Sequence, residues 1–83
     1  MGYDGKELYR CKDLMRAAAF LALGIPLNGL NSRGRFYDFM FEDPEKCRVI
    51  EQEWWRGTLQ VNAVKYADSI KRLKNMVFSR KDR

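Results

Sequence analysis

The chain has 83 residues and a mass of 9.8 kDa, which is the size of one small domain. Hydrophobic residues make up 46% of it and charged residues 33%, so it carries enough apolar side chains to form a core. It contains no histidine and two cysteines, which excludes a zinc finger and any catalytic group built on histidine. We therefore expect neither an enzyme nor a metal or cofactor site.

The longest unbroken apolar run covers residues 17–23, far fewer than the roughly 20 residues that a membrane-spanning helix needs. The first residues lack the apolar stretch of a signal peptide. We therefore expect a cytoplasmic protein without a membrane partner. In that compartment Cys11 and Cys47 are expected to be buried thiols rather than a disulfide.

The net charge of +5 arises entirely from the C-terminal end. Residues 1–64 contain nine basic and nine acidic side chains, whereas residues 65–83 contain seven basic side chains against Asp68 and Asp82. This polarity is typical of a protein whose C-terminal end contacts phosphate or an acidic partner, although a solvated helix face gives the same pattern. The candidate nucleic-acid contacts here are Lys65, Lys71, Arg72, Lys74, Arg80, Lys81 and Arg83.

In chain order, residues 7–11 suit a brief strand, and Asp13 is placed to cap a helix over residues 14–23 that ends at Gly24. Only Arg16 is polar in that helix, whereas a surface helix of a small domain has a polar face. We expect the helix to be covered on more than one side, either within the fold or in a homo-oligomer.

Extended structure follows to residue 42, and two turn sites compete for a hairpin. Asn28-Gly29 is a strong two-residue turn signal, but a turn there leaves a short first strand that contains Pro26. The turn is therefore predicted at residues 31–34, with Asn28-Gly29 as a bulge. Alternation along the second strand gives a predicted core face of Tyr37, Phe39 and Phe41, and an opposite face of Phe36, Asp38, Met40 and Glu42.

Asp43-Pro44-Glu45 predicts the start of a helix that runs to Arg56 and stops at Gly57. A last helix follows, capped by Asn62. The predicted core stripes are Cys47, Ile50 and Trp54 in the first of these helices, and Ala63, Tyr66, Ala67, Ile70, Leu73 and Val77 in the second.

The whole chain, residues 1–83, is thus predicted to form a single compact α+β domain. Its order is a short N-terminal strand, an apolar helix, a β-hairpin and two C-terminal helices, with the small sheet covered by the helices. A frayed N-terminus is predicted over about residues 1–6, and a basic tail over about residues 79–83.

Three segments of the chain read "KDLMRAAAFLALGIPL", "GRFYDFMFED" and "NAVKYADSIKRLKNMVFS". They combine an Ala-rich helix opened by Asp-Leu and followed by Gly, a strand of alternating aromatics, and a closing amphipathic helix, with an aromatic pair before Gly57. This pattern, from about Tyr9 to Ser79, resembles a family of small bacterial and phage proteins catalogued only as a domain of unknown function. The resemblance implies this architecture and a bacterial or mobile-element setting, and it implies no activity.

Basic and aromatic residues interleave over residues 33–41, as on sheets that stack RNA bases. The pattern does not match such a sheet, because Arg35 occupies the place of the first aromatic and the chain closes with a helix where a strand is needed. The aromatics are therefore predicted to line the core. Arg33 and Arg35, at an exposed hairpin tip, remain candidate phosphate contacts.

Trp54 and Trp55 are adjacent on a helix and so point about 100° apart. Trp54 is predicted to lie in the core. Two alternatives stay open for Trp55. It forms an exposed protein interface together with Arg56, or it packs against the connector over residues 58–61.

These features lead to two hypotheses. The leading one is a non-enzymatic, nucleic-acid-associated protein that binds through its basic C-terminal helix without base specificity. The alternative is a protein interaction module, either a homodimer or a phage-encoded regulator of a host protein, and it is motivated by the apolar helix and by Trp55.

Overall fold

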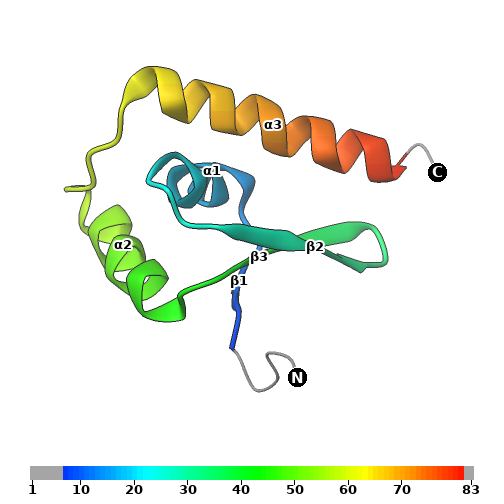
Figure 1. Ribbon diagram of the computed structural model, residues 1–83, viewed down its shortest axis with the longest axis horizontal. Coiled ribbons are helices and arrows are strands. Elements are labelled where there is room, and N and C mark those ends of the chain that lie inside the picture. The colour runs from blue at the N-terminus through cyan, green and yellow to red at the C-terminus, as the bar shows by residue number, and fades with distance from the viewer. Residues whose placement is uncertain (1–6, 82–83) are drawn as a thin grey trace.

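The computed structural model describes residues 7–81, with Lys81 by its backbone alone (Figure 1). Within this range the chain forms three strands and three helices in the predicted order, and the α+β architecture is confirmed. The predicted frayed N-terminus and Arg83 lie outside the described residues. The elements are β1 (Tyr9–Cys11), α1 (Leu14–Ala22), β2 (Leu27–Arg33), β3 (Phe36–Phe41), α2 (Pro44–Arg56) and α3 (Ala63–Lys81).

The helix boundaries follow the capping residues of the sequence. The side-chain oxygens of Asp13, Asp43 and Asn62 each accept a hydrogen bond from the backbone N–H three residues later, at 3.0, 3.4 and 3.0 Å. Gly24 and Gly57 follow α1 and α2 with φ values of +91° and +78°, a conformation that favours glycine. Local chemistry therefore fixes where all three helices begin and where α1 and α2 end.

The three strands form an antiparallel sheet in the order β1-β3-β2, so β3 is the central strand. The hairpin turn lies at Gly34 and Arg35, later than the centre of the predicted turn, because β2 continues through Arg33 and pairs it with Phe36. The predicted bulge is confirmed, since the register shifts between Leu27 and Gly29.

Helix α1 lies between α3 and the sheet, which makes it the middle of three layers (Figure 1). The ring of Phe20 joins α1 to the sheet. It packs edge-on against Tyr9 of β1 and Phe41 of β3, with 5.5 and 5.2 Å between ring centroids. The apolar helix is thus covered within the chain, which is one of the two alternatives left open by the sequence.

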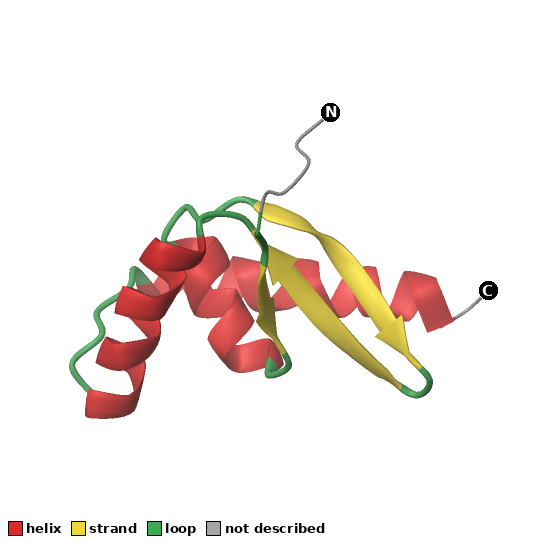
Figure 2. Cartoon of the chain, turned by 90° about the horizontal axis from the view of Figure 1, so that it is seen from below, coloured by secondary structure: helices red, strands yellow, loops and turns green. Residues whose placement is uncertain are grey.

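One face of the sheet is left without a helix. Figure 2 views the sheet from the side away from α1 and α3, and among residues 7–81 no helix crosses this outer face. Strand alternation places Phe36, Asp38 and Met40 on it, as predicted, and Phe39 and Phe41 on the buried inner face. The prediction that all these aromatics line the core is wrong for Phe36, which is 63% exposed.

The predicted core stripe of α3 is partly wrong. Ala63 and Ala67 are exposed, whereas Ser69 is buried beside Leu73, and Met76 packs against the core. A stripe chosen by hydrophobicity omits serine, although a small side chain suits a place where two helices approach closely. Helix α1 offers three buried alanines, Ala17 to Ala19, in the same core.

Cys11 and Cys47 are free and buried, in agreement with the prediction that they are not a disulfide. Each thiol lies near a backbone carbonyl, 3.4 Å from the oxygen of Asp13 and 3.7 Å from that of Glu42. Across the described part of the chain, no helix has the length and apolar character needed to cross a membrane.

Candidate functional site

The basic residues of α3 do not share one face of the helix. The side packed on α1 is centred on Leu73, and at 100° per residue Lys65 and Arg72 lie on one flank of it and Lys74 on the other. Lys71 points away from the core. These four side chains are exposed, as is Arg80, whereas the side chain of Lys81 and the whole of Arg83 lie outside the described residues.

The predicted core stripe of Ala63, Tyr66, Ala67, Ile70, Leu73 and Val77 also predicts Lys65 and Arg72 opposite the core, with Lys71 and Lys74 on its flank, and the structure corrects this placement. The error follows from the misplaced stripe, since removing Ala63 and Ala67 from it and adding Ser69 rotates the buried side of the helix. Only part of the predicted basic surface can therefore meet one ligand at a time.

A groove opens between the hairpin and the C-terminal half of α3. We call it the hairpin groove, and its volume is about 430 Å³. Its cations come from three places in the chain: Lys12 follows β1, Arg33 ends β2, and Arg35 forms the turn. Among the described residues that line it, none is acidic. The lining residues are Lys12, Leu14, Arg33, Arg35, Phe36, Tyr37, Phe39 and Val77.

A second, smaller hollow of about 230 Å³ adjoins the hairpin groove and shares Leu14 and Val77 with it. Its other lining residues are Lys74 and Phe78 of α3. The fold therefore brings the predicted hairpin cations Arg33 and Arg35 onto the same side of the molecule as Lys74, one of the predicted cations of the last helix.

Arg33 is not a free cation. Its Nε donates a hydrogen bond to Oδ2 of Asp38 at 2.8 Å, and Nε of Arg10 lies 3.4 Å from the same oxygen. The side chain of Asp38 is fully buried beneath the two guanidinium groups, and its Oδ1 has no hydrogen-bond partner among the described residues. One carboxylate thus orients two arginines on the outer face of the sheet.

Sequence reasoning missed Arg10, Lys12 and Asp38 as site residues. Lys12 and Arg10 belong to the part of the chain whose charges balance, so composition gave no reason to select them. The position of Asp38 in the hairpin indicates its ion pair with Arg33. A turn at Gly34-Arg35 pairs Asn31 with Asp38, which places Arg33 diagonally across from Asp38, within reach of a long side chain.

The other predicted interface residues, Trp55 and Arg56, lie on α2. Trp55 is 67% exposed, and the guanidinium that stacks on it belongs to Arg16 of α1, at 5.3 Å from the ring centroid, rather than to the adjacent Arg56. Glu51 joins this contact, because its Oε2 accepts a hydrogen bond from Nε1 of Trp55 at 3.4 Å. Arg56 is exposed.

Trp54 is only half-buried, which corrects the prediction that it lies in the core. It lines a hollow together with Gly57, Leu59, Val61 and Tyr66, so the connector passes beside Trp54, whereas the Trp55 side chain is exposed. The two adjacent rings therefore point in different directions, as expected from their 100° separation. Trp54 lies beside the connector and Trp55 faces solvent.

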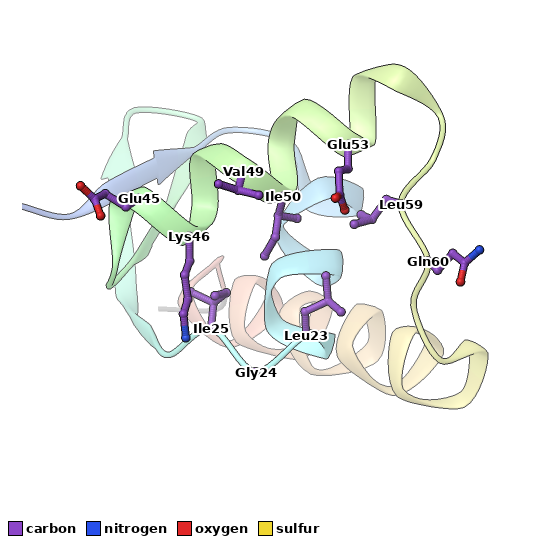
Figure 3. Close-up of a pocket in the computed structure, with 10 residues that line it drawn as sticks. All are labelled: Leu23, Gly24, Ile25, Glu45, Lys46, Val49, Ile50, Glu53, Leu59 and Gln60. Atoms are coloured by element: carbon purple, nitrogen blue, oxygen red, sulfur yellow. The ribbon is translucent and has the colours of Figure 1, made fainter.

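An apolar cleft of about 530 Å³ lies between α2 and the turn that follows α1 (Figure 3). Ile50 and Lys46 extend from α2 toward Leu23 and Ile25, whereas Glu45 and Gln60 point away from the cleft. Val49 and Leu23 on its walls are partly open to solvent. The cleft is on a different side of the fold from the hairpin groove, with which it shares no lining residue.

Within residues 7–81, no three potential metal-ligating side chains of the His, Cys, Asp or Glu type lie together. Comparison with protein-family models, with curated proteins and with solved structures found no match for this chain. The geometry of the chain itself is therefore what supports a function.

Proposed function

We propose that this protein is a non-enzymatic binding protein that holds nucleic acid in the hairpin groove. The observation that supports the proposal most strongly is the convergence of Lys12, Arg33 and Arg35 around an apolar floor, with Lys74 at the adjoining hollow. Cations of this kind attract phosphates without reading sequence. The resemblance to small bacterial and phage proteins adds the prediction of a bacterial or mobile-element setting.

The remaining cations of α3 have a different part in this proposal. Lys65, Lys71 and Arg72 are exposed and line neither the groove nor the adjoining hollow, so in this proposal they contribute a diffuse positive potential that speeds encounter. The groove cations make the direct phosphate contacts. Replacing Lys12, Arg35 and Lys74 removes the same charge as replacing Lys65, Lys71 and Arg72, which makes a charge-matched comparison possible.

The experiment is fluorescence anisotropy with a labelled oligonucleotide at about 50 and 200 mM salt, comparing two triple variants. Lys12→Gln/Arg35→Gln/Lys74→Gln removes groove cations, and Lys65→Gln/Lys71→Gln/Arg72→Gln removes the same charge from α3. The groove variant should bind more weakly and lose about 2 from the slope of log affinity against log salt, at roughly 0.7 per contact with a single strand. The control variant should keep most of the affinity and most of the salt slope of the unaltered protein.

Equal losses in the two variants would contradict the groove as the binding site, because diffuse attraction depends on the total charge alone. Absence of binding at the lower salt concentration would contradict nucleic-acid binding as a whole.

The alternative function, a protein interaction module, is favoured by the apolar cleft of α2. Val49 is 57% exposed on its wall, next to Ile50 and Leu23. Exposed apolar surface beside a cleft suits a protein partner, including a second copy of the chain. Light scattering tests the homodimer form: a dimer mass that Val49→Lys returns to the monomer value supports it, and a monomer mass for the unaltered chain at about 100 μM contradicts it.

A further inference from the structure

Phe36 is the aromatic side chain of β3 that the fold leaves open to solvent. It is 63% exposed at the start of the strand, whereas Phe39 and Phe41 further along are buried. Phe36 is paired with Arg33 across the hairpin, and it also lines the hairpin groove. A large apolar ring thus stands among cations at the point where the groove meets the outer face of the sheet.

The cations beside this ring are held in place. Asp38 of the central strand lies between Arg10 of β1 and Arg33 of β2, with Nε–Oδ2 distances of 3.4 and 2.8 Å. The side chains of these arginines remain 54% and 41% exposed, so N–H groups not used by Asp38 face solvent. One carboxylate balances only one of the two charges, and a net positive charge stays beside Phe36.

A stacking ring next to oriented cations matches the chemistry of a single strand. In a duplex the base faces are stacked on one another, so a protein ring at the surface gains nothing from them. In a single strand each base offers a free face, and an aromatic platform with a basic groove along the backbone is the usual way such strands are held.

We propose that the hairpin groove binds single-stranded nucleic acid, with one base stacked on Phe36 and the neighbouring phosphates on Arg33, Arg35 and Lys12. This inference rests on the proposed function and adds the class of nucleic acid to it. The stack is sequence-tolerant, because every base has an aromatic face. The protein should therefore prefer single strands to duplexes without selecting a particular sequence.

The test compares three labelled probes of equal phosphate number per strand: oligothymidine, an abasic oligomer of the same length, and a duplex of mixed sequence. For the unaltered protein, the abasic oligomer should bind at least about fivefold more weakly than oligothymidine, which is the lower end of the effect of one stacked base. The duplex should also bind more weakly than oligothymidine at the same salt concentration.

Phe36→Leu keeps an apolar side chain and removes the aromatic face. It should bring oligothymidine to the affinity of the abasic oligomer and leave the salt slope unchanged, since no cation is lost. Trp55→Leu is the matched control, because it removes an equally exposed ring on α2, outside the groove.

Equal affinity of the unaltered protein for oligothymidine and the abasic oligomer would overturn the stacking proposal, whatever the fold of the variants. Duplex binding as tight as single-strand binding would overturn it as well. In either case a loss of binding in the Lys12/Arg35/Lys74 variant would leave the proposed function standing. If none of the probes binds, the proposed function itself fails.

Discussion

The hydroxyl of Tyr66 in α3 donates a hydrogen bond of 3.1 Å to the backbone oxygen of Met15 in α1, across 51 residues of sequence. It joins the two helices at their contact, where Tyr66 packs beside the buried Leu73 stripe. Burial raises the pKa of the Tyr66 hydroxyl, with a smaller contribution from the carboxylate of Asp13. The phenol therefore keeps its proton, and with it the ability to donate this bond, to a higher pH than an ordinary tyrosine does.

Tyr66→Phe tests the energetic value of this contact, because it removes the hydroxyl and keeps the ring. The free energy of unfolding should fall by about 0.5–1.5 kcal/mol, the usual net contribution of one hydrogen bond. Urea unfolding followed by tryptophan fluorescence measures it. Val64→Ala, at an exposed position on the outer side of α3, is the control and should change stability by less than about 0.5 kcal/mol. An unchanged stability in Tyr66→Phe would show that the bond contributes nothing in solution.

Asp38→Asn separates oriented cations from total charge. It raises the net charge by one, so a purely diffuse attraction would tighten nucleic-acid binding. We expect weaker binding of a single strand, because Arg10 and Arg33 lose the carboxylate that orients them. Stability should also fall by about 1–2 kcal/mol, below the full value of a buried charged hydrogen bond because both arginines are about half exposed.

Asp68→Asn is the matched control for Asp38→Asn, since it makes the same change of charge at an exposed position of α3. Anisotropy and urea unfolding of both variants give the comparison. Tighter binding by Asp38→Asn, equal to that of Asp68→Asn, would show that charge alone governs affinity.

The elements of this fold are predictable from the sequence because their signals are local. Asp13, Asp43 and Asn62 act on backbone groups within one helical turn, and Gly24 and Gly57 act on their own backbone angles. None of these signals depends on a distant part of the chain. The α+β order could therefore be predicted without knowledge of the packing.

The candidate site could be predicted only in part, because it depends on contacts between distant segments. Arg33 and Arg35 are predicted from the hairpin, but Lys12 joins them only because β1 pairs antiparallel with β3 and sets Cys11 opposite Phe39, so that the end of β1 runs toward the hairpin. Lys74 comes near through the packing of α3 on α1, and the buried side of α3 includes Ser69, a residue that hydrophobic periodicity does not select.

The exposed position of Trp55 leads to a prediction about stability. Trp55→Ala should cost about 0.5–1 kcal/mol, because the ring buries little surface and its main contact is the stack with Arg16. Arg16→Ala should cost more than Trp55→Ala, because its side chain is mostly buried and also pairs with Glu51, and the double variant should lose less than the sum if ring and guanidinium act as a pair. Urea unfolding of the three variants completes the cycle. A strictly additive result would contradict coupling between the ring and the guanidinium.

The buried thiols predict a dependence of stability on pH. Burial, with smaller contributions from Asp43 and Cys11, raises the pKa of the Cys47 thiol from 9.0 to about 11, and burial also raises that of Cys11. In the unfolded chain the Cys47 thiol ionises near its ordinary value, while in the folded chain it stays protonated up to about pH 11. The unfolded state therefore releases its proton first, so the contribution of this thiol to stability should be fully present below about pH 9 and be lost between about pH 9 and 11.

Urea unfolding at intervals from pH 7 to pH 10.5 measures this fall. The free energy of unfolding of Cys47→Ala, relative to its value at pH 7, should fall by less than that of the unaltered chain. At neutral pH Ellman's reagent should label both thiols slowly in the folded protein and rapidly in denaturant, because each thiol is buried and protonated. Labelling of the native protein at the rate of a free thiol would mean that the α2 contact around Cys47 opens readily. In that case the free energy of unfolding of Cys47→Ala would fall with pH as steeply as that of the unaltered chain.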